Sequence, residues 1–177
     1  MEETTREIPE RVREVIARHG LRALVFEPGS TPTSEKAAIR IGAATGQIAK
    51  SILMRGKDGA YRLVVMRGDT RIHPGKLKRV AGCKHRMASP EETLEVTGFP
   101  VGGVCPFGIE DLEIYIDEGL GCFETVYPAA GTDASGVPVT PRLLEAVTGG
   151  RFCDLAREAL ETGRLPLHQP GDKEGFD

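Results

Sequence analysis

The segment QIAKSILM, residues 47–54, limits more than any other stretch how this chain can fold. Its alternate positions, which share one face if the segment is a β-strand, are Ile48, Lys50, Ile52 and Met54. A lysine among apolar neighbours must either reach water along its alkyl stem or line a pocket. In a pocket, desolvation lowers the pKa of the ammonium, which could then bind an anion, polarise a carbonyl or form a Schiff base. Spacing alone leaves the exposed and the pocket-lining positions of Lys50 both open.

The rest of the chain predicts alternating helices and strands. Helical periodicity and caps predict helices at 6–19, 33–42, 73–82, 89–98 and 140–150. Apolar alternation predicts strands at 21–27, 47–55, 60–68, 83–88 and 112–117, and another within 122–131. Ser89 and Glu92 form the clearest capping box, and either Thr31 or Thr33 caps the helix that follows. These elements predict one α/β (α+β) domain with a mixed sheet over residues 1–177, with a frayed tail at 168–177.

The stretch GGVCPFG, residues 102–108, is too rich in glycine and proline for a regular element. Such a loop can direct backbone N–H groups at an oxyanion or a sugar hydroxyl, or it can simply connect two elements tightly. Cys105 lies inside it, but no basic residue is near in sequence to activate a thiolate. The pattern favours a role for the loop backbone over a nucleophilic cysteine.

The charge distribution bears on nucleic-acid binding. The net charge of −3 and an aromatic content of 5% argue against a dedicated nucleic-acid binder. Residues 67–86, however, hold seven Lys or Arg and two His against one acid, Asp69. This stretch is either a solvated basic face or a landing surface for phosphates. The candidate phosphate contacts within it are Arg67, Arg71, Lys76, Lys78 and Arg79.

Several classes of protein are not expected. The four cysteines include no C-x-x-C pair and fit reduced cytosolic thiols, and the four histidines lack metal-ligand spacing. Neither a P-loop nor a dinucleotide-binding glycine motif is present. The N-terminus does not resemble a signal peptide, and no run of 18 apolar residues predicts a membrane span. We therefore expect a cytoplasmic protein without metal, cofactor or membrane contact.

Taken in order, these segments resemble the YbaK/prolyl-tRNA editing domain family. The resemblance rests on QIAKSILM, a Gly-Asp pair at 68–69, TGFPVGGVCPFG at 97–108, and then IYID and AAG. It covers roughly residues 33–149. Its two specific motifs are the strand lysine, Lys50, and a G-x-x-x-P loop running from Gly102 to Pro106.

The resemblance implies a single α/β domain with a mixed, partly barrel-like sheet flanked by helices. It implies a free-standing aminoacyl-tRNA deacylase that uses no cofactor and acts on the 3′ end of a tRNA carrying a small amino acid such as Ala, Ser, Thr or Cys. An aminoacyl-tRNA synthetase is a further possible partner. The segment FEPGSTPTSEKAA lacks the histidine or second aromatic residue of many relatives, which leaves the amino acid open. Two alternatives are a non-catalytic binder of tRNA ends or synthetases and a Schiff-base enzyme using Lys50.

The resemblance also implies site residues. The expected catalytic group comprises Lys50 and the loop residues Gly102, Gly103, Val104, Cys105 and Pro106. The expected substrate-binding residues are Thr33, Ile48, Ile52, Met54, Asp69, Phe107 and Gly131. The weak tRNA contacts would come from the basic residues of the 67–86 stretch.

Overall fold

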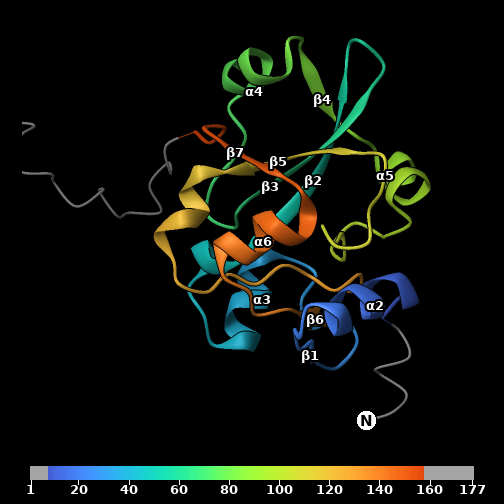
Figure 1. Cartoon of the computed structure of the whole chain (residues 1–177), viewed down its shortest axis with the longest axis vertical. Helices are drawn as coiled ribbons and strands as arrows, with labels where there is room; N and C mark the ends of the chain where they lie inside the picture. Colours follow the sequence, from blue (N-terminus) through green and yellow to red (C-terminus); the bar gives the residue numbers. More distant parts are fainter. Residues whose placement is uncertain (1–7, 158–177) are drawn as a thin grey trace, which may run out of the picture.

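The structure is a computed structural model that describes residues 8–157 (Figure 1). The helices are α2 (Glu10–Arg18), α3 (Ser34–Ile41), α4 (Pro74–Ala81), α5 (Pro90–Thr97) and α6 (Pro141–Thr148), with two short 3₁₀ helices, η1 (Thr45–Gln47) and η2 (Glu118–Cys122). The strands are β1 (Leu24–Val25), β2 (Ala49–Gly56), β3 (Tyr61–Arg67), β4 (His85–Met87), β5 (Glu113–Asp117), β6 (Ser135–Gly136) and β7 (Arg151–Cys153). The predicted α/β fold class is confirmed.

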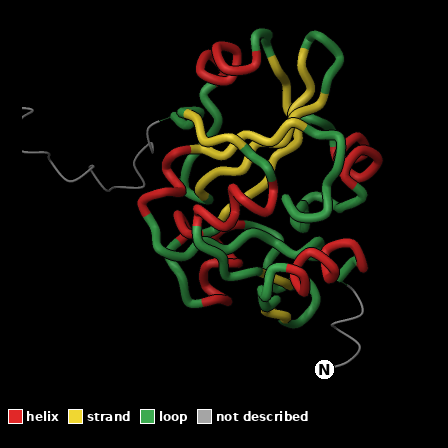
Figure 2. Tube along the Cα trace, in the orientation of Figure 1, coloured by secondary structure: helices red, strands yellow, loops and turns green. Residues whose placement is uncertain are grey.

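The main sheet has five strands in the order β4-β2-β3-β5-β7 (Figure 2). Strand β2 is antiparallel to both of its neighbours, β4 and β3, whereas β3, β5 and β7 run parallel, so the predicted mixed sheet is confirmed. The sheet is open, because β4 and β7 form its two edges, and it does not close into a barrel. A separate two-stranded sheet pairs β1 with β6.

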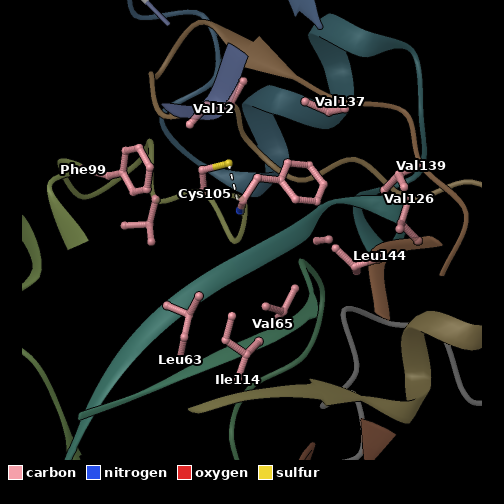
Figure 3. Packing of buried hydrophobic residues seen from close by; sticks show 14 of the residues in the cluster. Val12, Leu63, Val65, Phe99, Cys105, Ile114, Val126, Val137, Val139 and Leu144 are labelled. Carbon is pink, nitrogen blue, oxygen red and sulfur yellow. Dashed lines mark hydrogen bonds between the residues drawn. The ribbon is translucent and has the colours of Figure 1, made fainter. Parts of the chain in front are cut away.

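Side-chain alternation along β3 divides the apolar residues between the two faces of the main sheet. Two clusters of buried apolar residues pack against the sheet, and we call the one with more members the larger core. Leu63 and Val65 point into the larger core, together with Val12 of α2 and Leu144 of α6 (Figure 3). The intervening residues point to the opposite face, where they pack against Leu77 of α4. The same alternation along β2 sends Lys50 to the α4 face, away from the larger core.

The predicted helix caps are present. Ser89 Oγ accepts a hydrogen bond from Glu92 N at 3.1 Å, and the Glu92 carboxylate accepts one from Ser89 N at 3.0 Å, which completes the capping box. Thr33, not Thr31, caps α3 by accepting from Lys36 N at 3.2 Å. These side chains satisfy N–H groups that have no partner inside the helix.

Some expected elements differ from the structure. Residues 122–131 form no strand, and Val126 and Tyr127 make only isolated bridges to Val139 and Ile48. Pro128 lacks an N–H group and could not continue a ladder there. Strand β7 was not predicted, because three residues carry too little alternation. The expected frayed tail lies outside the described residues. Within residues 8–157, no helix is both long and apolar enough to cross a bilayer.

Candidate functional site

A cavity of about 200 Å³ lies where α3, the start of β2 and the Gly/Pro-rich loop meet. We call it the first cavity. It is lined by Thr31, Pro32, Thr33, Ser34, Ala37, Ile41, Ile48, Ala49, Lys50, Ser51, Gly102, Val104, Tyr127, Ala129 and Ser135. The structure thus brings Lys50 together with Gly102 and Val104, which are about fifty residues away in sequence. Thr33 and Ile48, two expected substrate-binding residues, line the same cavity.

The ammonium of Lys50 is held by backbone carbonyls. Lys50 Nζ donates to Thr70 O and, at 3.4 Å, to Gly68 O. An ammonium has three donors, so one remains for a ligand in the cavity. Burial lowers the pKa of Lys50 from its ordinary value of 10.5; nearby Glu35 opposes this shift and Arg71 reinforces it. The side chain of Lys50 is therefore half-buried, and the carbonyls of Gly68 and Thr70 fix the position of its ammonium.

The loop at 102–106 depends on two glycines. Gly102 has φ of +92°, a conformation that side chains with a Cβ rarely adopt. Gly103 lies so close to Thr132 that a Cβ would come within 2.9 Å of the Thr132 backbone. Gly103 donates its N–H to Pro100 O at 2.9 Å, which closes the turn. Within residues 8–157 the N–H groups of Gly102 and Val104 have no such acceptor.

Ser51 lines the first cavity, although strand alternation places its side chain on the face opposite to Lys50. Its Oγ is buried and has no hydrogen-bond partner within the described part of the chain. A buried hydroxyl without a partner is costly, so this one is available to a ligand. Strand alternation could not reveal it, because the first cavity extends around the beginning of β2 and is lined by residues from both faces.

Two other cavity hydroxyls are already used. Ser135 Oγ accepts from Ala130 N at 3.0 Å, and Thr31 Oγ1 accepts from Ser135 N at 3.2 Å. These bonds hold the segment after Tyr127 against the beginning of α3. The sequence suggested Thr31 only as a helix cap and gave no signal for Ser135, because the contact that joins the two residues spans 104 positions.

The structure places the other expected substrate-binding residues away from the first cavity. Ile52 and Met54 line a second cavity on the α4 face. Phe107 is buried in the larger core. Asp69 pairs with Arg67 at 2.7 Å, and Gly131 allows close contact with Phe99 and Pro9, where a Cβ would come within 2.9 Å of each side chain.

The five expected phosphate contacts differ in their surroundings. Arg67 is paired with Asp69, and Lys76 is paired with Asp154 at 2.9 Å. Arg71 lines the second cavity. Lys78 and Arg79 are exposed on α4. Among the described residues, no group of three His, Cys, Asp or Glu side chains is arranged to hold a metal ion.

Cys105 is fully buried, and its sulfur accepts from Phe107 N at 3.4 Å (Figure 3). Burial raises the pKa of this thiol to about 12, so it stays protonated at neutral pH.

We expect Cys105→Ala to lower the free energy of unfolding by about 1 kcal/mol through lost packing. Its kcat/KM on any hydrolysed substrate should stay within about twofold. Native Cys105 should not react with Ellman's reagent, whereas exposed Cys122 should; a tenfold loss of rate with an intact fold would contradict the prediction.

The chain is similar in sequence and structure to several known proteins. A family model described as an aminoacyl-tRNA editing domain matches residues 28–146. The uncharacterized protein YwhH of Bacillus subtilis (strain 168) is 45% identical over 116 residues, which cover 65% of this chain and 74% of YwhH. A proline--tRNA ligase of Thermosipho melanesiensis is 36% identical over 100 residues, which cover 56% of this chain and 17% of the ligase. A solved structure described as a candidate trans-editing enzyme for prolyl tRNA synthetase has a TM-score of 0.76 and 38% identity, covering 83% of this chain and 95% of that chain.

Proposed function

The chain belongs to the aminoacyl-tRNA editing domain family, and from this premise we propose that it is a trans-acting deacylase of mischarged tRNA. The proposed reaction is hydrolysis of the ester that joins a small amino acid to the 3′-terminal ribose. The single observation that carries the proposal is the first cavity, which is lined by half-buried Lys50 and by Gly102 and Val104, whose backbone N–H groups have no backbone acceptor within residues 8–157. This arrangement suits an ester, which water can attack without a strong nucleophile.

The loop supplies the stabilisation of charge in this proposal. When water adds to the ester carbonyl carbon, negative charge develops on the carbonyl oxygen. The N–H groups of Gly102 and Val104 are the candidate donors to that oxygen, because Gly103 N–H is already used by Pro100 O. Donors fixed before the reaction stabilise such charge most effectively, since they need not reorganise.

Lys50 orients the substrate in this proposal. Its remaining N–H donor would bind the ribose or the phosphate edge and hold the ester against the loop. The bond from the carbonyl carbon to the ribose oxygen then breaks, and the ribose oxygen takes up a proton from the attacking water. A neighbouring ribose hydroxyl would relay this proton. Free amino acid and uncharged tRNA are the products.

The size of the first cavity supports a small amino acid. Its volume is about 200 Å³, and its apolar walls come from Ala37, Ile41, Ile48, Tyr127 and Ala129. A hydrophobic pocket distinguishes one methylene by only about 1–3 kcal/mol when it must attract its ligand, so exclusion by size is the stronger filter. Alanyl, seryl, threonyl and cysteinyl esters are the candidate substrates.

Widening the cavity should relax this filter. We expect Ile41→Ala to raise the ratio of kcat/KM for valyl-tRNA over alanyl-tRNA by at least about tenfold, because each methylene accommodated is worth about 1–3 kcal/mol. The matched control is Ile39→Ala on the same helix, since Ile39 is 82% exposed and does not line the cavity. An unchanged ratio in Ile41→Ala would mean that Ile41 does not limit substrate size.

The direct test uses the pure protein and a panel of mischarged tRNAs, with release of each amino acid followed over time. Hydrolysis of one or more small aminoacyl esters, lost in a Lys50 variant, is expected. If no ester in the panel is hydrolysed and wild type and variant behave alike, the deacylase proposal is wrong. Binding of the same tRNAs without turnover would instead favour a non-catalytic module, and borohydride trapping of a carbonyl substrate on Lys50 would favour a Schiff-base enzyme.

A further inference from the structure

The second cavity lies on the other side of Lys50, between β2, β4 and α4, and has a volume of about 590 Å³. Lys50 lines both cavities, so the two are neighbours and a ligand held at its ammonium is next to both. The second cavity is within the 300–1,000 Å³ range of ordinary ligand sites. The first cavity has room for the amino acid, and the proposed reaction leaves this larger space unexplained.

We propose that the second cavity binds the terminal nucleotide of the tRNA, with the base on its apolar floor and the phosphodiester at two arginines, Arg71 and Arg157. The inference rests on the proposed function, because it takes the ester in the first cavity as the fixed point. It adds the residues that would hold the nucleotide.

The floor of the second cavity suits a flat, weakly polar ring. Ile52 and Met54 of β2 and Leu77 of α4 line it, and Met87 of β4 lies at its edge with 64% of its surface exposed. Met87 therefore continues the apolar floor of the cavity out to its exposed edge. Methionine is also flexible and polarisable, and it makes favourable contacts with aromatic rings.

The charge of the second cavity is entirely positive. Arg71 and Arg157 are exposed at its rim beside Lys50, and no acidic residue lines it. Neither guanidinium has an acidic partner within residues 8–157. This differs from Arg67 and Lys76, which are neutralised by nearby carboxylates. Arginine binds phosphate through paired N–H donors, so two unneutralised arginines fit a phosphodiester.

The two arginines are held together by the backbone. Arg157 N donates to Arg71 O at 2.8 Å. The buried carboxylate of Asp117 accepts from Leu155 N at 2.9 Å and from Ala156 N at 3.1 Å, which fixes the segment that carries Arg157. These contacts fix the backbone positions from which both arginine side chains extend.

The second cavity contains binding groups and no groups for bond cleavage. Its one histidine, His85, has both ring nitrogens engaged, with Nδ1 2.9 Å from Cys83 O and Nε2 2.8 Å from Arg62 Nη1. No cysteine, serine or carboxylate lines the cavity. Apart from Lys50, which it shares with the first cavity, the second cavity has a cationic rim over an apolar floor, and this suits it to hold a nucleotide whose reacting bond lies elsewhere.

The test measures binding of the uncharged RNA trinucleotide CCA, labelled with fluorescein at its 5′ end, by fluorescence anisotropy. Removing both guanidinium groups in Arg71→Ala/Arg157→Ala should weaken binding at least about tenfold. It should also reduce the slope of log Kd against log salt by about 0.7, since the two arginines hold one phosphodiester and each single-strand phosphate contact contributes about 0.7. A trinucleotide with an abasic 3′ end should bind wild type about tenfold more weakly, because a stacked base contributes measurably to affinity.

The matched control is Arg13→Ala/Arg18→Ala, which removes the same charge from exposed positions on α2 (Figure 1). It should bind CCA within about twofold of wild type, since α2 does not line the second cavity. If the arginine double variant does not fold, Met87→Glu serves in its place, because it puts a carboxylate at the exposed edge of the cavity. It should weaken CCA binding by a similar factor.

The outcomes separate this inference from the proposed function. If wild type hydrolyses a mischarged tRNA but the Arg71/Arg157 variant keeps its Kd and KM within twofold, the inference is wrong and the deacylase proposal stands. If no tRNA is hydrolysed but CCA binding depends on the two arginines, the deacylase proposal fails and the nucleotide site stands. Displacement of CCA by free AMP at equal affinity would overturn assignment to a tRNA end in favour of a mononucleotide site.

Discussion

Lys50→Met is expected to lower kcat/KM for deacylation about 100-fold, the loss that misplacing the reacting ester by about 1 Å can cause. Methionine matches the length of the lysine stem and removes the ammonium of a residue that lines both cavities. The free energy of unfolding should change by less than about 1 kcal/mol, because relief of desolvation offsets the lost hydrogen bonds to Gly68 and Thr70. Release of amino acid from mischarged tRNA and urea unfolding measure the two effects.

The control for Lys50→Met is Lys57→Met, which removes an exposed ammonium in the β2–β3 turn and should leave the rate unchanged. A Lys50 variant with undiminished deacylation and an intact fold would remove Lys50 from the mechanism. The pH profile adds a second readout. If the ammonium is needed, kcat/KM falls as pH rises through the lowered pKa of Lys50, below its ordinary 10.5, once spontaneous ester hydrolysis is subtracted.

The lowered pKa of Lys50 should also affect the free energy of unfolding. This free energy should rise with pH, whereas kcat/KM should fall. Between the folded pKa of Lys50 and its unfolded value, the unfolded chain binds more protons, so the contribution of Lys50 to the free energy of unfolding rises with pH. The unfavourable contribution is fully present below the folded pKa. Lys50→Met should lack this rise, whereas Lys57→Met should keep it.

Gly103→Ala is expected to lower both stability and activity. The added Cβ would lie 2.9 Å from Thr132 Cα and carbonyl carbon, and both are backbone atoms that cannot rotate away. Overpacking of this kind costs about 1–3 kcal/mol. Relief of the clash must move the loop that carries the N–H groups of Gly102 and Val104, and misplacement by about 1 Å can cost up to 100-fold in rate. We expect a loss in kcat/KM of at least about tenfold.

Gly121→Ala is the matched substitution for this experiment. Gly121 lies in η2, its φ is not positive, and a Cβ there would meet no atom within 4 Å. It should change the free energy of unfolding by less than about 0.5 kcal/mol and leave the rate unchanged. If Gly103→Ala behaved like Gly121→Ala in urea unfolding and in deacylation, the close packing of the loop against Thr132 would contribute neither to stability nor to the rate.

Local rules predicted much of the fold from the sequence. The capping box at Ser89 and Glu92 and the N-cap at Thr33 are local hydrogen bonds, so the residues that form them are close in sequence. Alternation placed β2 and β3 correctly for the same reason. The meeting of Lys50 with Gly102 came instead from the resemblance of two motifs, because no local rule brings together residues fifty positions apart.

Features set by distant contacts could not be predicted in this way. Ile52 and Met54 share the face of Lys50, as alternation predicted. However, the first cavity contacts only the beginning of β2, and these two residues line the second cavity instead. Ser51 became a cavity residue for the same geometric reason. Arg157 reaches the second cavity only because Asp117 binds the chain after β7, and that contact spans 38 residues.

In the first cavity, the groups proposed to act on the ester differ from the side chains that limit its size. This separation affects how the substrate preference of such a protein can change. The groups proposed to act on the ester are one lysine and the backbone of a glycine loop, whereas the walls are side chains such as Ala37, Ile41 and Ala129. A substitution in a wall alters the volume available to the amino acid without moving the loop donors. Single substitutions in the walls can therefore change substrate preference, whereas a side chain at Gly103 would displace the loop on which the reaction depends.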